Sequence, residues 1–196
     1  ACPDGGNWLA QRVTSRKGHT KSTTTKSTTS APRFEHAPLV IDGSRIKLRS
    51  RVAGHIVKLP DDLPLPRIER RRSGVHGWGV FALERIPKNK RIIYYGGQLV
   101  PSRESHGREV AYLEKGCIWC FELSTRWAVD AMYGGNVSRF INHACKPNAY
   151  SQIVDGIIWI RAGRTIEAGE ELTYDYYTGG TAEIACQCRP GCKGQI

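Results

Sequence analysis

The stretch RFINHACKPN (139–148) combines residue types that seldom share one segment. A strand of the core would avoid the adjacent Asn142 and His143, because buried polar groups cost free energy unless they are hydrogen-bonded. A plain surface loop would have no use for Phe140, Ile141 and Cys145 together. The composition therefore fits neither a core strand nor a plain surface loop, and it marks the segment as a candidate functional one.

Length and hydropathy limit what the chain can be. With 196 residues it forms one domain, or one domain with an appendage, and it can bury a sizeable core. No apolar run approaches the ~18 residues of a membrane helix, so we expect a soluble protein without membrane contact. The chain opens with Ala1 and shows no signal-peptide pattern, which predicts that a fragment boundary lies there.

The positive charge is concentrated near the N-terminus. Residues 1–72 hold 15 Lys and Arg against 6 Asp and Glu, whereas residues 73–196 hold 14 against 12. Residues 14–31 are mostly Thr, Ser and Lys and cannot bury a core, so we expect them to be disordered. Residues 1–38 are interpreted as a basic arm that contacts DNA or a nucleosome; a solvated tail without a partner is the alternative.

From residue 39 onward the pattern favours short strands between turns. Basic residues at every second position from 45 to 51 predict a strand with one basic face. Further strands are expected near 79–83, 91–100, 116–123, 126–132 and 170–177, with a hairpin over 149–162 that turns at Asp155-Gly156. The segment 102–116 is the only convincing helix, and Ser102 is its expected N-cap. The fold class is therefore mostly β.

Seven cysteines, an odd number, do not resemble the disulfide framework of a secreted protein and favour an intracellular one. Three of them, Cys186, Cys188 and Cys192, lie within seven residues, close enough to bind one Zn²⁺, which takes four ligands in a tetrahedron. The fourth ligand remains open among Cys2, Cys117, Cys120, Cys145 and a histidine. The alternative is three incidental cysteines in a tail.

Other motifs are weaker by themselves. Cys117 and Cys120 form a CxxC in an apolar segment and are interpreted as core cysteines. In GVHGWGV (74–80), Gly77 and Gly79 would let a ligand approach backbone amides, although a simple turn explains them equally well. In ELTYDYY (171–177), alternate tyrosines share one face of a strand, where core packing is the usual reason for them.

Taken together, these motifs resemble one family. GWGVFA (77–82), YYGGQLV (94–100), VDAMYGGNVSRFINHACKPN (129–148), EAGEELTYDYY (167–177) and the C-terminal cysteines match SET-domain protein lysine methyltransferases in order and spacing, over residues 68–192. The family's fold consists of small curved sheets with a C-terminal pseudoknot and a zinc-binding tail. The resemblance implies the SET domain at 68–178 and a post-SET zinc knuckle at 179–196. Residues 39–67 lie outside the resemblance and are interpreted from their own pattern as flanking strands.

The resemblance also implies roles for individual residues. Those expected to bind S-adenosylmethionine are His76, Gly77, Trp78, Gly79, Trp119, Asn142 and His143. Those expected to line the lysine channel and align the amine are Tyr95, Tyr174 and Tyr176. Those expected to bind zinc are Cys145, Cys186, Cys188 and Cys192. The chain departs from the family's pattern in carrying Trp119 in place of Tyr and three rather than four residues between Cys188 and Cys192.

The implied function is methylation of a lysine side chain by S-adenosylmethionine, with a histone tail as the default substrate and mainly monomethyl product. A non-histone basic protein is the nearest alternative substrate. A catalytically silent SET module that binds chromatin is the alternative of another class; such a module would be expected to have lost Asn142, His143 or Tyr176, and all three are present. We expect a monomer, nuclear and chromatin-bound in a eukaryote and cytoplasmic otherwise.

Overall fold

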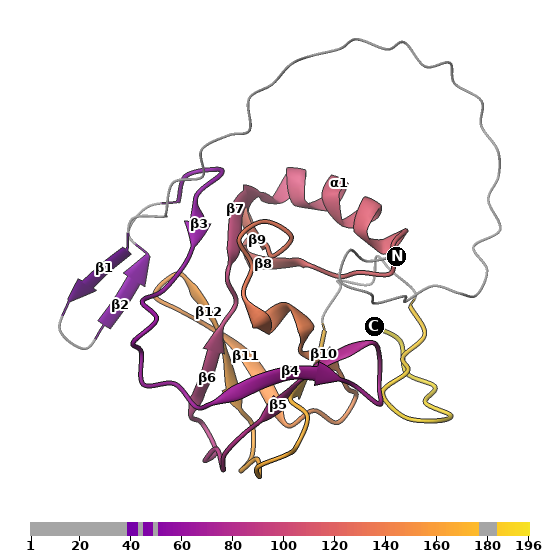
Figure 1. Cartoon of the computed structure of the whole chain (residues 1–196). Coiled ribbons are helices and arrows are strands. Elements are labelled where there is room, and N and C mark those ends of the chain that lie inside the picture. The colour runs from indigo at the N-terminus through magenta and orange to yellow at the C-terminus, as the bar shows by residue number, and fades with distance from the viewer. Residues whose placement is uncertain (1–38, 43–44, 49–50, 177–183) are drawn as a thin grey trace, which may run out of the picture.

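The computed structural model describes residues 39–42, 45–48, 51–176 and 184–196 (Figure 1). Its strands are β1 (Leu39–Asp42), β2 (Arg45–Leu48), β3 (Ile56–Val57), β4 (Ile68–Arg72), β5 (Trp78–Ala82), β6 (Arg91–Tyr94), β7 (Gly97–Pro101), β8 (Cys120–Ser124), β9 (Trp127–Asp130), β10 (Asn142–His143), β11 (Ala149–Val154), β12 (Ile157–Ala162) and β13 (Thr173–Tyr174). The helices are α1 (Ser102–Leu113) and a 3₁₀ turn, η1 (Val137–Phe140). The prediction of a mostly β fold is confirmed. The basic arm predicted at 1–38 lies outside the described residues.

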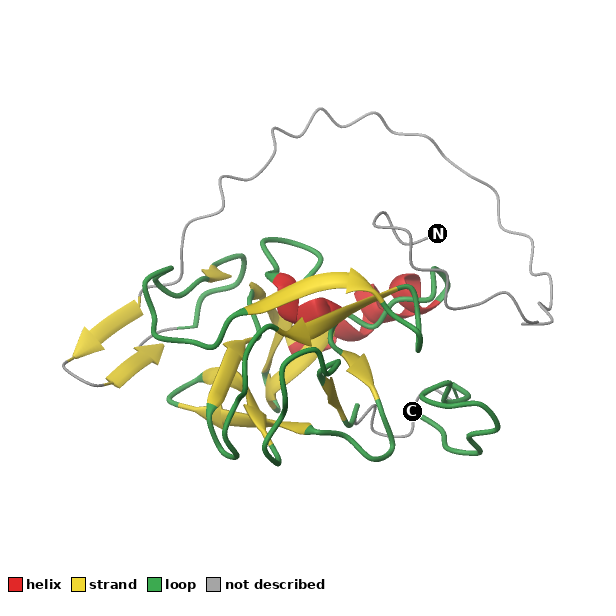
Figure 2. Cartoon of the chain, turned by 60° about the horizontal axis from the view of Figure 1, so that its bottom comes forward, coloured by secondary structure: helices red, strands yellow, loops and turns green. Residues whose placement is uncertain are grey.

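The described strands form several small sheets rather than one large one. The largest has the order β3-β7-β9-β8 and is antiparallel, and a second has the order β11-β12-β6. The remaining described pairs are β1-β2, β4-β5 and β10-β13. The β1–β2 hairpin projects from one end of the molecule and the C-terminal segment lies at the other end (Figures 1 and 2).

The predicted hairpin at Asp155-Gly156 is present and shows how the sequence specifies the turn. Asp155 has φ 53° and Gly156 has φ 80°, the two positive values of the turn type that suits the twist of two-residue hairpins. Strand β12 then runs through the middle of its sheet, and Ile157, Ile158 and Trp159 are at most 2% exposed. A continuous apolar run is expected where both faces of a strand are covered.

Two apolar clusters form the core. One packs Leu99, Trp119 and Trp159 among the four-stranded sheet, α1 and the start of β12. The other joins Ile141 and Leu172 to residues of β5, β6 and β12. Ile141 and Leu172 directly precede β10 and β13, so the second cluster fixes the two segments that carry the polar motifs.

Helix α1 is present as predicted, but the prediction that Ser102 caps it was wrong. Pro101 occupies the N-cap position, with no side-chain capping bond, and Ser102 lies inside the first turn. The Ser102 hydroxyl donates to the carbonyl of Ser124 at 3.3 Å, and the Ser105 hydroxyl donates to Ser102 at 2.8 Å. A serine next to a proline can serve tertiary packing as well as capping, and local sequence does not distinguish the two.

The inward face of α1 is polar, and it is anchored by hydrogen bonds. Asp130 at the end of β9 is fully buried and accepts from Arg108 at 2.7 Å and from the Tyr112 hydroxyl at 2.9 Å. The pairing offsets the cost of burying that carboxylate. Val110, on the opposite face, is 60% exposed. The position of α1 therefore depends on specific polar contacts as well as on the packing of Tyr112 against Trp119.

Strands β10 and β13 pair in parallel, although 29 residues separate them in the chain. Asn142 lies opposite Thr173, and His143 opposite Tyr174. This short ladder brings the RFINHACKPN segment against the tyrosine-bearing segment, which answers why residues 139–148 are both apolar and polar. In the described ranges, no helix has the length and apolar character of a membrane span.

Candidate active site and metal centre

Asn142 is the centre of a buried polar network. It is 5% exposed, and its amide nitrogen lies 3.0 Å from the carbonyl of Trp78 and 2.8 Å from the carboxylate of Glu171. Weaker contacts reach the carbonyl of His76 at 3.4 Å and the hydroxyl of Ser73 at 3.3 Å. One side chain thus connects β10, the loop before β5 and the segment before β13.

The loop at 73–77 is shaped by Ser73 and Glu171. The Ser73 hydroxyl lies 2.8 Å and 2.9 Å from the two carboxylate oxygens of Glu171, and it accepts from the amides of Val75 and His76. A Cβ on Gly79 would lie 2.2 Å from an oxygen of Glu171, so a larger residue there would displace that carboxylate from Ser73 and Asn142. Gly79 was predicted from the sequence, whereas Ser73 and Glu171 were not, because residues 98 positions apart give no local signal.

His143 connects the tyrosine-bearing segment to the cysteines. It is 2% exposed, and its Nδ1 accepts from the backbone amide of Tyr176 at 3.1 Å. The ring proton then resides on Nε2, which lies 3.6 Å from the sulfur of Cys145. Burial lowers the pKa of His143, which favours the neutral ring and makes the nearby Asp175 carboxylate a minor partner.

Tyr95, Tyr174 and Tyr176, here called the tyrosine cluster, lie close together. The rings of Tyr174 and Tyr176 have centroids 4.7 Å apart, and Phe121 packs on Tyr95 at 5.1 Å and on Tyr174 at 5.9 Å. Trp119 contributes its carbonyl, which accepts from the Tyr95 hydroxyl at 3.1 Å. Phe121 was not among the predicted site residues, since an aromatic residue in a strand usually signals only core packing.

The hydroxyls of the tyrosine cluster are neutral and ordered. Burial raises the pKa of all three phenols above the ordinary value, so none ionises near neutral pH. The Tyr174 hydroxyl bonds to that of Tyr176, which in turn donates to the carbonyl of Ile141. The oxygen of Tyr176 keeps one acceptor position, which a donor group entering the cluster could use.

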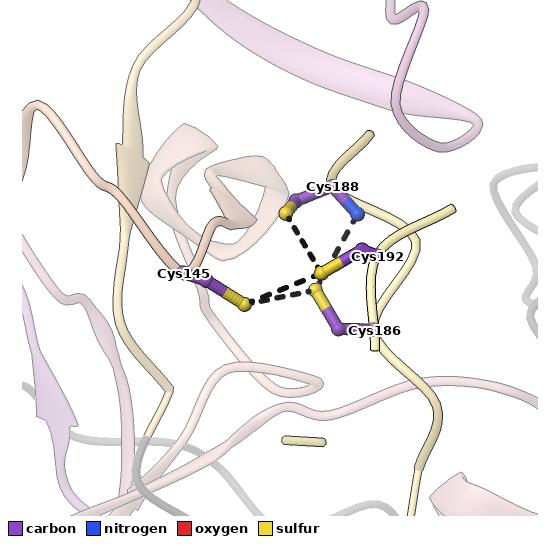
Figure 3. Close-up of side chains that lie close together, drawn as sticks. All are labelled: Cys145, Cys186, Cys188 and Cys192. Atoms are coloured by element: carbon purple, nitrogen blue, oxygen red, sulfur yellow. Dashed lines mark hydrogen bonds between the residues drawn. The ribbon is translucent and has the colours of Figure 1, made fainter. Parts of the chain in front are cut away.

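The four predicted metal ligands converge. Cys145, Cys186, Cys188 and Cys192, here called the cysteine cluster, have sulfurs that all lie within 4.8 Å of one another (Figure 3). The sulfur–sulfur distance is 3.5 Å for Cys145–Cys186, 3.6 Å for Cys145–Cys192 and 3.7 Å for Cys188–Cys192. A tetrahedron with zinc–sulfur bonds of ~2.3 Å has sulfurs about 3.8 Å apart, so the spacing fits Zn²⁺.

The surroundings of the cysteine cluster also suit thiolates. The amide of Cys188 donates to the sulfur of Cys186, and that of Gly194 to the sulfur of Cys192, each at 3.4 Å. A Cβ on Gly194 would lie 2.6 Å from the sulfur of Cys145, so glycine permits the close approach. The three-residue gap between Cys188 and Cys192 does not prevent convergence. Cys117 is buried and Cys120 partly buried. Cys117 is also disulfide-bonded, which the interpretation of the pair as core cysteines did not include.

A band of arginines and aromatic rings borders the loop at 73–77. Arg70 and Arg72 lie over the ring of Trp78, at 4.6 Å and 4.3 Å. Arg70 and Arg139 lie over Phe140, at 4.7 Å and 4.9 Å. Arg139 also donates to the carbonyl of Ala131. Flat apolar faces beside guanidinium groups can hold a planar base together with an anionic group.

The family model for the SET domain matches residues 77–177. A histone-lysine N-methyltransferase, H3 lysine-4 specific, from Debaryomyces hansenii is 41% identical over 136 residues, which are 64% of this chain and 12% of that protein. Histone-lysine N-methyltransferase set1 of Dictyostelium discoideum is 36% identical over 135 residues, 65% of this chain and 9% of that protein. The chain thus spans only a small part of these relatives.

A solved structure agrees with the family match. A chain of the complex described as ctPRC2 in an autoinhibited conformation bound to S-adenosylmethionine aligns with a TM-score of 0.53 and 32% identity, over 57% of this chain and 15% of that one. The family model covers more than half of the present chain, and the cysteine cluster fits the zinc knuckle that the resemblance implied. The chain belongs to the SET-domain family.

Proposed function

We propose that the protein transfers a methyl group from S-adenosylmethionine to the side-chain amine of a protein lysine. The observation that carries the proposal is the convergence of the tyrosine cluster with Asn142 and His143 across the β10–β13 ladder. Relatives that bear the name histone-lysine N-methyltransferase support it. The presence of both an ordered polar network and a buried phenol cluster disfavours a silent binding module.

The residues beside the β4–β5 turn suit S-adenosylmethionine. We assign its binding to His76, Gly77, Trp78 and Gly79 on one side and to Asn142 with His143 on the other. A Cβ added to Gly74 would meet no atom within 4 Å, so the turn has open space beside it. Arg70, which lies beside Trp78, offers a cation for the carboxylate. When bound, S-adenosylmethionine supplies a methyl group on a positively charged sulfur.

The tyrosine cluster would prepare the lysine. The ordinary pKa of a lysine side chain is ~10.4, so its ammonium group must lose a proton before the amine can act as a nucleophile. Aromatic walls and a neighbouring positive charge both favour the neutral amine; lowering the pKa to about 8 corresponds to roughly 3 kcal/mol. Water can accept that proton. The acceptor position left on Tyr176 would then bind an amine N–H and orient the lone pair, and orientation supplies much of the rate.

A histone tail is the proposed substrate, and the H3 tail is the first to test, since several relatives are named for H3 lysine-4. The test is transfer of a radiolabelled methyl group to mixed core histones, compared with a lysate freed of histones. Labelling of histone H3 above all other bands is expected. If only lysate proteins are labelled, the substrate is a non-histone protein. If neither sample is labelled, the proposal that the protein is an enzyme is wrong.

The product is proposed to be mainly monomethyl-lysine. The hydroxyl of Tyr174 lies beside that of Tyr176 in the closely packed cluster, and it takes space that added methyl groups would need. Tyr174→Phe is expected to shift the product toward di- and trimethyl-lysine while keeping activity within about tenfold. Mass spectrometry of a peptide with one lysine measures the distribution.

Phe121→Tyr would be the opposite change, since it adds a hydroxyl next to Tyr95 and Tyr174. It should leave the product monomethylated. Abundant trimethyl-lysine from the unmodified protein would contradict the argument about space around Tyr174.

The N-terminal arm is proposed to bind DNA or nucleosomes. Residues 1–38 hold 6 Lys and Arg against 2 Asp and Glu. Deleting 1–38 should weaken DNA binding at low salt and flatten its salt dependence, because fewer phosphates are neutralised. Turnover of a short peptide should remain nearly unchanged. Loss of peptide turnover on deletion would instead make the arm part of the catalytic unit.

The remaining assignments are also proposals. The catalytic unit is placed at 68–178, with flanking strands at 39–67 and a zinc knuckle at 179–196. We propose that it acts on chromatin in the nucleus and that the chain is a monomer. Size-exclusion chromatography with light scattering measures the oligomeric state.

A further inference from the structure

The lysine channel proposed above is formed partly by a segment that has its own support. Trp119 supplies the carbonyl that accepts from Tyr95, and Phe121 supplies the ring that packs on Tyr95 and Tyr174. Cys120 lies between them, at the first position of β8. Whatever fixes Cys120 therefore sets the position of two walls of the channel at once.

Glu109 holds Cys120 at two points. Its Oε2 accepts from the backbone amide of Cys120 at 3.1 Å, and its carboxylate is also hydrogen-bonded to the Cys120 thiol. Glu109 belongs to the polar inward face of α1, one turn before Tyr112, which is anchored to Asp130. A charge-assisted bond is roughly twice as strong as a neutral one, so a carboxylate is well suited to this role.

The surroundings of Glu109 are not those of an ordinary surface carboxylate. Burial raises the pKa of Glu109 to about 7, and the charge of Asp130 on β9 acts in the same direction. The charged group next to it on α1, Arg108, is directed to Asp130 and Glu104. The chain therefore keeps a partly buried acid that costs stability when ionised, and such a cost is expected at a functional position.

We propose that Glu109 is a positioning residue for methyl transfer: its carboxylate fixes Cys120 and, through Trp119 and Phe121, the geometry of the lysine channel. The proposal rests on the lysine methyltransferase function proposed above. It predicts that a change at Glu109 lowers kcat and alters the methylation state of the product without weakening binding of S-adenosylmethionine.

The decisive variant is Glu109→Gln, which keeps an acceptor oxygen and the side-chain shape but removes the charge. Because the folded pKa is above the ordinary carboxyl value, the folded chain retains a proton that the unfolded chain has lost between about pH 4.5 and 7. The unmodified protein therefore loses stability as pH rises through that window. Glu109→Gln should melt at a higher temperature than the unmodified protein at pH 8, and the difference should vanish near pH 4.

Although the same variant should be more stable at pH 8, it should be less active. At pH 8 we expect a several-fold lower kcat for Glu109→Gln and a loss on the order of 10²-fold for Glu109→Ala, which misplaces the channel walls by about 1 Å. The dissociation constant for S-adenosylmethionine should stay within twofold. Glu122→Gln is the matched control. It replaces the same side chain by the same amide, but Glu122 lies on β8 with its side chain exposed. A residue with only a structural role would lower stability and activity together.

The experiment combines these assays with amide hydrogen exchange of Cys120, which does not depend on catalysis. We expect the amide of Cys120 to exchange faster in both Glu109 variants, which also lose kcat. Exchange in β11–β12 should stay unchanged, and Glu122→Gln should show no change at Cys120. Unchanged exchange at Cys120, or an unchanged kcat, would overturn the proposal. If the unmodified chain transfers no methyl group, the methyltransferase function fails, and faster exchange would still establish that Glu109 holds Cys120.

Discussion

Tyr176→Phe is expected to lower kcat for methyl transfer by about 10²-fold, because it removes the hydroxyl that we propose orients the lysine amine. That hydroxyl donates to the Ile141 carbonyl, and its remaining acceptor position is the one left for substrate. The ring stays packed against Tyr174, so the variant should fold and bind S-adenosylmethionine as the unmodified chain does. Single-turnover kinetics with a lysine peptide gives the rate of the chemical step.

Tyr150→Phe serves as the matched control. Tyr150 lies on β11, and its hydroxyl makes one long contact, 3.4 Å, with Asn89. It should change kcat by less than twofold. If Tyr176→Phe also left the rate unchanged, the amine would have to be oriented by another group, and the proposed role of Tyr176 would be wrong.

Removal of zinc is expected to abolish activity altogether. The cysteine cluster joins Cys145, next to the β10–β13 ladder, to three cysteines of the C-terminal segment, and thiolates brought this close repel one another without a metal. Structural zinc contributes about 10–16 kcal/mol to folding in zinc-finger peptides, so chelation should unfold the tail. His143, which contacts both Cys145 and Tyr176, would transmit the loss to the active site.

Plasma emission spectrometry should find one zinc per chain, and addition of zinc after chelation should restore activity. Cys188→Ser should reproduce the effect of chelation, whereas Lys193→Ala, an exposed neighbour of Cys192, should keep both zinc and activity. Full activity in protein that contains no metal would contradict a structural zinc site.

The parts of the structure that local chemistry specifies could be predicted from the sequence. Asp155 and Gly156 define their turn wherever they stand in a hairpin, and three cysteines within seven residues indicate a metal site before any folding is known. Cys145 as the fourth ligand came only from resemblance, because 41 residues separate it from Cys186. Spacing along the chain gave no reason to choose it over Cys117 or Cys120.

The parts that depend on long-range contacts could not be predicted. Glu171 and Ser73 meet across 98 residues, and each looks like an ordinary polar residue in its own segment. In the sequence, Glu109 looks like a solvent-exposed charge on a helix. Its partner, the amide of Cys120, comes after a turn whose geometry the sequence does not reveal, so the contact could not be predicted. Ser102 had the right residue type for an N-cap, and the neighbouring Pro101 occupies that position instead.

The central proposal is that the tyrosine cluster orients a lysine amine for methyl transfer from S-adenosylmethionine. Its most direct test is mass spectrometry of an H3-tail peptide that contains lysine 4 as its only lysine, after incubation with zinc-loaded protein and S-adenosylmethionine. We predict a gain of one methyl group on that lysine in the unmodified protein, and almost none in Tyr176→Phe. The contradicting result is a peptide of unchanged mass and no labelling of whole histones or lysate. It counts when the protein used binds both zinc and S-adenosylmethionine.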